Sequence, residues 1–411
     1  MRLLHTSDWH LGHRLYGRKR YAEFADFLQW LLKLLARERI HGLVIAGDVF
    51  DTTTPSHRAQ QLYYEFLHQA VSQSPCRHLI IVGGNHDSPS LLEAPKSLLQ
   101  HRGIRVIGAA PKHSEEEVLV LRDAAQRPEL IVCAVPYLRD QDLRIAVSGE
   151  DPADKTQQLL AGLGAHYAAV ARAAERVRAD LGGSLPILAT GHLFAQGGRT
   201  AEGDGVRELY IGSLARLPVS AFPDSLDYIA LGHLHRPQSL GDAPHIRYSG
   251  APLPLSFGKA RREQSLCLVE FAPEVRTPRI RQIPVPRFQR LERLRGDWMQ
   301  IEAQLRALRE ERVSAWLEIL YEGKALGNLR ERLAEAVKDS DLDILRITDT
   351  RYRERVLRPV FPQETLADLH PEEVFERCLA QHEIPEAQRS TLKLSYREVL
   401  HELANADPQE E

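Results

Sequence analysis

GLVIAGDVFD, residues 42–51, decides the fold of this chain, because an apolar run ends there in a glycine and a polar segment. A short apolar run bounded by turn residues is typical of a buried strand. HLIIVGGNHD, residues 78–87, repeats the pattern, and residues 56–72 between the two runs carry apolar side chains at helical spacing. Strands that alternate with helices predict an α/β fold in which helices cover a sheet.

The alternation continues on both sides of this stretch. Further strands are expected over 2–6, 130–135, 186–190, 227–231, 246–248, 265–271 and 279–283, and helices over 20–39 and 155–181. The proline-rich stretch 283–286 predicts a boundary. After it a β-α-β-α-β pattern follows, in which Asp297 is placed to cap a helix. We therefore expect three segments: a main domain over 1–283, a small α+β domain over 287–350, and a basic linker with amphipathic helices over 351–411.

Composition narrows the class of protein. The 411 residues carry a formal net charge of -3 and are 43% hydrophobic, which is ordinary for a globular protein and argues against disordered or collagen-like classes. Nucleic-acid binding would have to come from local basic patches, because the whole chain is slightly negative. The four cysteines lie far apart without a C-x-x-C motif, which argues against a disulfide framework. The polar N-terminus does not resemble a signal peptide, so we expect a cytoplasmic protein with no membrane span.

Five short motifs at predicted strand ends carry carboxylate, amide and imidazole groups. They are Asp8-Trp9-His10, Gly47-Asp48, Gly84-Asn85-His86-Asp87, Gly191-His192 and Gly232-His233-Leu234-His235. Residues i and i+2 of an extended backbone point the same way, so Asp8 and His10 can face one ion. Asp48 has two carboxylate oxygens with which to bridge two ions. One histidine at a strand end is more often hydrogen-bonded than metal-bound, but five such motifs in order predict a site for divalent metal. Mixed ligation of this kind suits Mn, Fe or Zn better than Mg or Ca.

These motifs, in this order, resemble those of calcineurin-like metallophosphoesterases. The similarity extends to the SbcD-type nuclease subunits of bacterial SbcCD complexes and covers essentially the whole chain, with the tail matching least. It rests on MRLLHTSDWHLG (1–12), GDVFDT (47–52), GGNHDS (83–88), ATGHL (189–193), YIGS (210–213), YIALGHLHRPQ (228–238) and SGAPLPLSF (249–257). The resemblance implies a β-sandwich flanked by helices, with a small α+β capping domain and a C-terminal helical tail.

The resemblance also implies roles for single residues. One metal ion would be held by Asp8, His10, Asp48 and His235, and the other by Asp48, Asn85, His192 and His233. His86 would be the catalytic histidine that acts on the leaving oxygen, and Asp87 would orient it. Archaeal double-strand-break repair nucleases carry a histidine three residues after the bridging aspartate, whereas this chain has Asp51 there. Asp51 could support a ligand or hold a neighbouring backbone, and we leave it out of the ligand set.

Two further stretches concern nucleic acid and partners. Arg14, Tyr16, Arg18, Lys19 and Arg20 form a basic segment with an aromatic residue, which is able to contact phosphates. A solvated loop before the next helix is an equally good interpretation. The apolar helices expected over 56–72 and from residue 90 either pack on the sheet or, as the resemblance implies, form a homodimer. The C-terminal helices either bind an SbcC-type SMC-like ATPase, the partner that the resemblance implies, or pack on the small domain.

The motifs and the resemblance together imply a Mn-dependent DNA nuclease with two metal ions. The resemblance implies double-strand exonuclease and single-strand or hairpin endonuclease activity within an ATP-dependent complex for DNA repair, replication and recombination. The chain has no P-loop motif, so ATP dependence would come from another chain. A free-standing metallophosphoesterase acting on a nucleotide or phosphoprotein would share every ligand, and a non-enzymatic scaffold of the same fold would lack some of them.

Overall fold

The computed structural model describes residues 1–144, 152–199, 216–260, 262–272, 275–324, 326–349, 375–376, 379, 389 and 392–396. The chain divides into two compact units, Met1–Glu292 and Arg293–Glu411. The predicted division of the second unit at residue 351 stays a proposal, because the segment that follows lies almost wholly outside the described residues.

A six-stranded sheet contains the stretch from which the fold was predicted. Its order is β14-β13-β1-β4-β5-β6, formed by β1 (Arg2–Thr6), β4 (Gly42–Ala46), β5 (His78–Val82), β6 (Ile104–Ile107), β13 (Ser265–Glu270) and β14 (Arg279–Pro284). β1, β4, β5 and β6 are parallel to one another. At one edge of the sheet, β13 pairs antiparallel with β1, and β14 pairs antiparallel with β13. β4 is fully buried, as its apolar run predicts.

A second six-stranded sheet has the order β11-β12-β10-β9-β8-β7. Its strands are β7 (Val118–Arg122), β8 (Pro128–Cys133), β9 (Ile187–His192), β10 (Tyr228–Gly232), β11 (Gln238–Leu240) and β12 (Ala243–Tyr248). The two sheets pack face to face, because Leu3 and Val44 of the first share a buried cluster with Val132 and Leu188 of the second. The predicted α/β class and β-sandwich are confirmed.

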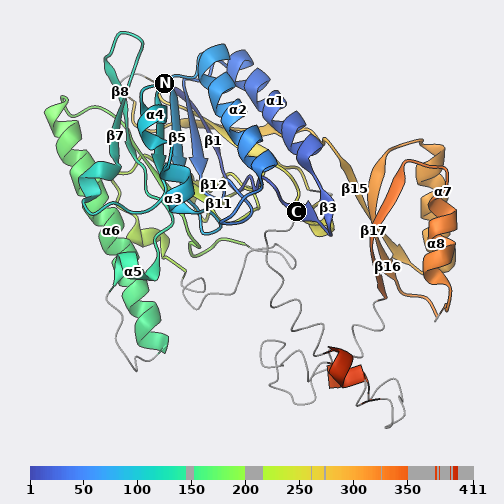
Figure 1. Ribbon diagram of the computed structural model, residues 1–411. Coiled ribbons are helices and arrows are strands. Elements are labelled where there is room, and N and C mark those ends of the chain that lie inside the picture. The colour runs from blue at the N-terminus through green and yellow to red at the C-terminus, as the bar shows by residue number, and fades with distance from the viewer. Residues whose placement is uncertain are drawn as a thin grey trace. The chain divides into compact units, whose positions relative to one another are not determined.

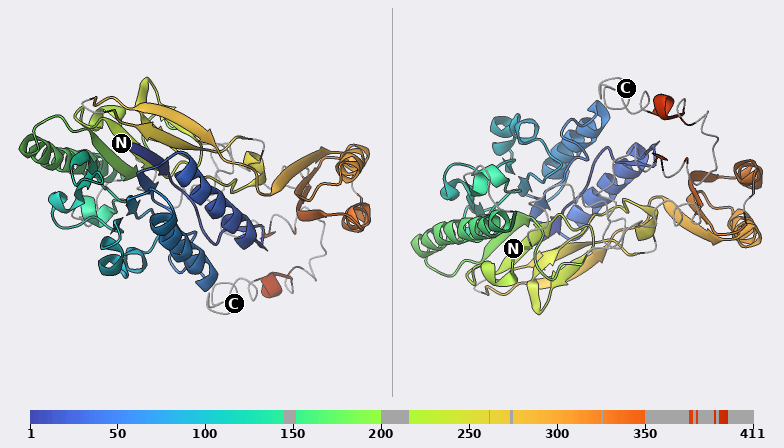
Figure 2. Two further views of the ribbon diagram at one scale, coloured as in Figure 1. Left: turned by 90° about the horizontal axis from the view of Figure 1, so that it is seen from above. Right: turned by 90° about the horizontal axis from the view of Figure 1, so that it is seen from below.

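Helices cover the outer faces of the sandwich (Figures 1 and 2). α1 (Tyr21–Arg37) and α2 (His57–Gln73) lie side by side and bury Phe24, Phe27, Tyr63 and Phe66 against the first sheet. α6 (Pro152–Asp180) lies on the other side and buries Tyr167 against the second sheet. The short helices are α3 (Pro89–Glu93), α4 (Lys96–Gln100) and α5 (Asp140–Leu143). Among the described residues, no helix is both long and apolar enough to cross a bilayer.

The second unit contains the expected β-α-β-α-β pattern. β15 (Arg290–Gly296) begins just before the boundary and continues into this unit, and α7 (Trp298–Glu310), β16 (Ala315–Tyr321), α8 (Leu329–Val337) and β17 (Leu342–Asp349) follow, with sheet order β15-β16-β17. Asp297 caps α7 as predicted: its side chain accepts from Gln300 N–H at 3.0 Å, and the Gln300 side chain accepts in return from Asp297 N–H.

The predicted amphipathic tail helices fall mostly outside the described residues. Of the tail, the structure describes helical residues at 375–376, 379, 389 and 392–396. Phe375 stacks on Tyr396 with ring centroids 4.1 Å apart, and Lys393 pairs with Glu376. The two parts of the tail that are described therefore contact each other.

Candidate metal centre

The candidate ligands follow the C-terminal ends of strands in both sheets. β1 leads to Asp8 and His10, β4 to Asp48, and β5 to Asn85. His192 is the last residue of β9, and His233 follows β10. The sheets are tied together here, because His192 Nδ1 lies 2.9 Å from Ala46 O of β4. The parallel arrangement thus brings residues far apart in sequence to one edge of the sandwich.

Several candidate ligands have a left-handed backbone. The φ angles are 53° at Asp8, 46° at His10, 50° at Asp48 and 93° at His233. A left-handed conformation costs an L-residue roughly 1–2 kcal/mol. Such strain is concentrated at functional sites, where the surrounding structure holds it in place. Hydrogen bonds from Asp8 N–H to Gly47 O and from His10 N–H to Asp48 O, both 3.0 Å long, hold the first two loops in this shape.

The loops approach each other so closely that glycine is needed at two positions. A Cβ added to Gly84 would lie 2.1 Å from Asp48 Oδ1, and one added to Gly232 would lie 1.9 Å from Ala46 O. Both glycines belong to the motifs that the sequence singled out. Their missing side chains allow the loop after β5 and the end of β10 to close on β4.

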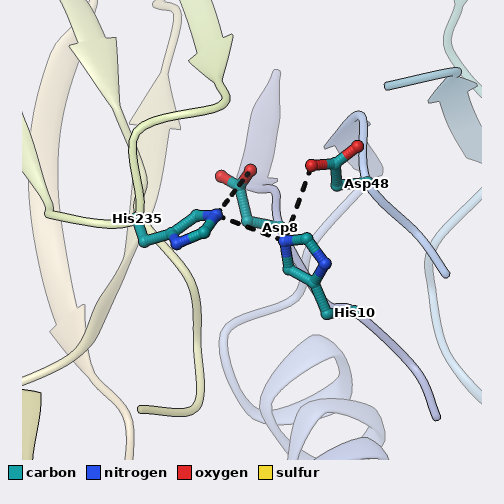
Figure 3. A group of neighbouring side chains, drawn as sticks. All are labelled: Asp8, His10, Asp48 and His235. Carbon is teal, nitrogen blue, oxygen red and sulfur yellow. Dashed lines mark hydrogen bonds and ion pairs between the residues drawn. The ribbon is translucent and has the colours of Figure 1, made fainter. Parts of the chain in front are cut away.

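A first group of ligand atoms comes from Asp8, His10, Asp48 and His235, all buried and all within 4.8 Å of one another (Figure 3). His10 Nε2 lies 3.2 Å from His235 Nε2 and 3.5 Å from Asp48 Oδ2. His235 Nε2 is 3.9 Å from Asp8 Oδ1. These are the four residues assigned to one ion by the resemblance.

A second group lies on the other side of Asp48. His192 Nε2 is 3.0 Å from Asn85 Oδ1 and 3.3 Å from Asp48 Oδ2. His233 Nδ1 is 3.1 Å from the same Asn85 oxygen. Asp48 Oδ2 therefore lies between an imidazole of the first group and one of the second, which is the position that a bridging carboxylate requires.

The electrostatics of the two groups fit cation binding. Burial opposes charge on Asp48, but the imidazoles of His192 and His10 lower its pKa well below the usual range. Burial also opposes charge on His192, yet the Asp48 carboxylate raises its pKa to about 9. Burial and the neighbouring His192 lower the pKa of His233 to about 3, so this imidazole is neutral and has a lone pair to offer.

Asp8 and Asp48 are buried carboxylates without a strong base as ion-pair partner in the described part of the chain. The only ion-pair partners of Asp8 and Asp48 among the described residues are histidines; neither pairs with lysine or arginine. A buried charge is costly unless it is paired or coordinates a metal. The donor set of imidazole, carboxylate and amide oxygen is one that divalent transition metals accept. The residues present therefore fit two divalent ions that share Asp48.

His86 lies beside these groups, but Asp87 does not hold it as expected. His86 Nδ1 is 2.8 Å from the carbonyl oxygen of Asp51. The Asp87 carboxylate instead accepts backbone N–H groups of Gly84, Val49 and Phe50 at 2.9, 3.1 and 2.9 Å. The predicted orienting role of Asp87 is wrong, because its buried carboxylate oxygens accept hydrogen bonds from three backbone N–H groups of the loops rather than from the His86 ring. Asp87 fixes the shape of the loop that carries Asn85.

The basic segment after the first motif forms a small hairpin of β2 (Arg14–Leu15) and β3 (Arg18–Lys19). Arg14, Arg18 and Lys19 are exposed, and Tyr16 is 41% exposed and stacks on Phe257 at 5.7 Å. Their contact with DNA stays a proposal.

Arg20, at the end of that segment, must be removed from the candidate DNA contacts. It is 1% exposed, and its guanidinium donates to both carboxylate oxygens of Glu23 at 2.8 and 2.9 Å and to Pro254 O at 2.8 Å. Its charge is thus neutralised inside the fold, and it fixes the start of α1.

The apolar helix expected over 56–72 packs as ordinary core. Leu62, Tyr63, Phe66 and Leu67 are all buried. They contact the first sheet and α1 rather than offering an apolar face, so a homodimer would need other residues. Leu98 of α4 is 75% exposed.

Sequence reasoning missed two serines that support Asp8. Ser7 Oγ donates to Asp8 Oδ2, and Ser249 Oγ lies 2.8 Å from Ser7 Oγ. Both are fully buried. Both serines lie in stretches that carry the family resemblance, 1–12 and 249–257, but they are 242 positions apart, so their contact could not be deduced from the sequence.

Comparisons with known proteins agree with the geometry. Residues 1–237 match the family model for calcineurin-like phosphoesterases, and residues 287–383 match a model described as the type 5 capsule protein repressor C-terminal domain. A relative from Escherichia coli K12, named as the SbcD component of the nuclease SbcCD, is 36% identical over 98% of this chain and 99% of its own length. Proteins of the same name from Rhodobacter capsulatus and Bacillus subtilis are 38% and 35% identical over 70% and 66% of this chain, covering 70% and 67% of their own lengths.

Proposed function

This chain belongs to the SbcD family of calcineurin-like phosphoesterases, and from that membership we propose that it is the DNA-cleaving subunit of an SbcCD-type complex. Membership makes it a metal-dependent phosphodiesterase of the nuclease type. The observation that carries the proposal is Asp48 Oδ2, which lies 3.5 Å from His10 Nε2 and 3.3 Å from His192 Nε2. One carboxylate oxygen between two sets of ligands is the arrangement that a two-metal hydrolase needs.

We assign one ion to Asp8, His10, Asp48 and His235, and the other to Asp48, Asn85, His192 and His233. When bound, two divalent ions provide a nucleophilic water and stabilise negative charge on phosphate oxygens. Among O- and N-binding metals, Mn is the one we propose for this mixed donor set.

His86 supplies the proton chemistry in this proposal. The Asp51 carbonyl can only accept, so His86 Nδ1 carries a hydrogen in that bond. Nε2 is then the nitrogen that exchanges a proton. Protonated, it can donate to the oxygen that leaves when the phosphodiester breaks, which is general acid catalysis.

We further propose that the substrate is DNA ends and hairpins, cleaved by exonuclease and endonuclease action in repair, replication and recombination. The named relatives are components of a nuclease, and the exposed Arg14, Arg18 and Lys19 give a local basic patch on a chain that is negative overall. The partner would be an SbcC-type ATPase bound through the C-terminal helices, and two copies of the chain would form a homodimer.

The alternative is a free-standing phosphoesterase acting on a nucleotide or phosphoprotein. It would use the same ligands, but it gives no role to the second unit or to relatives that match almost end to end.

The deciding experiment incubates the purified chain, alone and with an SbcC-type ATPase, with linear duplex DNA, hairpin DNA and a phosphomonoester, in Mn or Mg. The proposal predicts Mn-dependent cleavage of DNA and little turnover of the monoester. It also predicts that the His86→Ala variant cleaves neither DNA nor the monoester. Preferential hydrolysis of the monoester, with no DNA product, would favour the alternative.

A further inference from the structure

Asp51 contacts both a proposed metal ligand, His10, and the proposed general acid, His86. It follows Asp48 by three residues, in the loop after β4, and the residue before it, Phe50, pairs with Leu11, the residue after His10. Its N–H donates to Leu11 O at 3.3 Å, and Leu11 N–H donates to Val49 O at 2.9 Å. The two loops are therefore held side by side, and the Asp51 side chain is brought next to a candidate metal ligand.

The carboxylate of Asp51 faces Nδ1 of His10, the ring nitrogen that points away from the first ligand group. Its Oδ1 lies 3.3 Å from His10 Nδ1 and 3.0 Å from His13 Nδ1. The other ring nitrogen of His10, Nε2, faces Asp48 and His235 in the first ligand group. A hydrogen on Nδ1, directed toward Asp51, would leave the lone pair of Nε2 for an ion. Metal-bound histidines generally have such a carboxylate or carbonyl behind them.

Among the residues that the structure describes, His10 Nδ1 has no partner besides Asp51. It is buried and makes no hydrogen bond that meets the geometric limits, and the Asp51 carboxylate oxygen lies 3.3 Å from it.

The backbone of Asp51 holds the second histidine. Its carbonyl oxygen is 2.8 Å from His86 Nδ1, as described above. The rings of His10 and His86 are perpendicular, with centroids 4.8 Å apart. One residue thus contacts a ligand through its side chain and the proposed acid through its main chain.

We propose that Asp51 is a positioning residue: its carboxylate orients His10 for the first ion, and its carbonyl orients His86. This inference rests on the proposed function, because it takes His10 as a ligand and His86 as the acid. It also separates the two tasks, since a substitution removes the carboxylate and keeps the carbonyl.

The experiment titrates Mn into metal-free wild-type chain, Asp51→Ala and Asp51→Asn by calorimetry, with melting temperatures measured for all. In wild type we expect two ions. In Asp51→Ala we expect one of the two to bind about 10–100-fold more weakly, the usual effect of losing such a partner. Asp51→Asn keeps an acceptor oxygen, so its Mn affinity should lie between those of wild type and Asp51→Ala. At saturating Mn, each variant should recover most of its DNA cleavage, because the carbonyl still holds His86.

His13→Ala is the matched control. It removes the other neighbour of the Asp51 carboxylate and leaves His10 facing it, so Mn affinity should stay near that of wild type.

Unchanged Mn affinity in Asp51→Ala would overturn this inference but not the proposed function. Equal weakening of both ions, together with a large fall in melting temperature, would do the same. Asp51, His10 and His86 also form a group with ligand atoms within 4.8 Å; a third wild-type ion, lost in Asp51→Ala, would make Asp51 a ligand and contradict the proposal. A wild-type chain that binds no Mn would overturn the proposed function as well.

Discussion

Asp48→Asn tests the bridging residue with little change of shape. Asparagine has nearly the same volume and keeps an oxygen that can accept the N–H of His86, which donates to Asp48 Oδ1 at 2.9 Å. What it removes is a buried negative charge between His10 and His192. We expect the variant to lose both ions, because each ligand group then lacks its shared carboxylate.

In the metal-free chain, the size of the stability loss in Asp48→Asn follows from the interaction of Asp48 with His192. Burial alone would lower the pKa of His192, but Asp48 is the largest cause that raises it from 6.5 to about 9. At 1.36 kcal/mol per pKa unit, this shift stabilises the fold by up to roughly 3 kcal/mol. A raised histidine pKa stabilises fully below its unfolded value near 6.5, and the effect is lost as pH rises toward 9. Asp48→Asn should therefore destabilise metal-free protein most near pH 6 and little above about pH 9.

The assay is urea unfolding of wild type and variant in a chelator, at about pH 6 and about pH 9.5, with elemental analysis of the untreated proteins. Equal stability at the lower pH would refute the electrostatic reasoning. Two ions retained at normal affinity would show that Asp48 is not the bridge.

Three other substitutions or truncations follow from the structure. His86→Ala should abolish cleavage while both ions stay bound, and loss of an ion by elemental analysis would make His86 a ligand. Trp9→Ala should lower the free energy of unfolding by about 3–5 kcal/mol, because the indole is fully buried between Phe27 and Phe66; denaturant unfolding measures this, and a loss below about 1 kcal/mol would contradict it. Truncation after residue 360 should spare DNA cleavage and abolish co-purification with the ATPase, whereas a truncated chain that still binds the partner would place docking elsewhere.

Most strands that carry the site could be predicted because β4, β5, β9 and β10 each combine an apolar run with a glycine at or next to the end of the strand. β1 has the predicted bounds, and β4 and β5 coincide with the apolar runs that begin at residues 42 and 78, since a strand buried on both faces has little freedom in its sequence. β6 and β7 were missed. β6 is only four residues long, and the side chains of β7 are mostly half-buried, so neither pattern differs enough from a loop.

Within the site, residue types could be predicted but not hydrogen-bond partners. Aspartates, histidines and Asn85 at strand ends indicated a cation site, and the structure brings these side chains together. The acceptor for His86 could not be deduced, because it is a backbone carbonyl, and every residue has one. Arg20 was misjudged for a similar reason: the sequence shows a run of basic residues, but only the fold shows that one of them is paired with Glu23 inside the protein.

A Mn-soaked crystal measured at the manganese absorption edge would test the central claim most directly. The account predicts two anomalous peaks that share Asp48, one among Asp8, His10 and His235 and the other among Asn85, His192 and His233. A single peak, or two peaks without Asp48 between them, would contradict it.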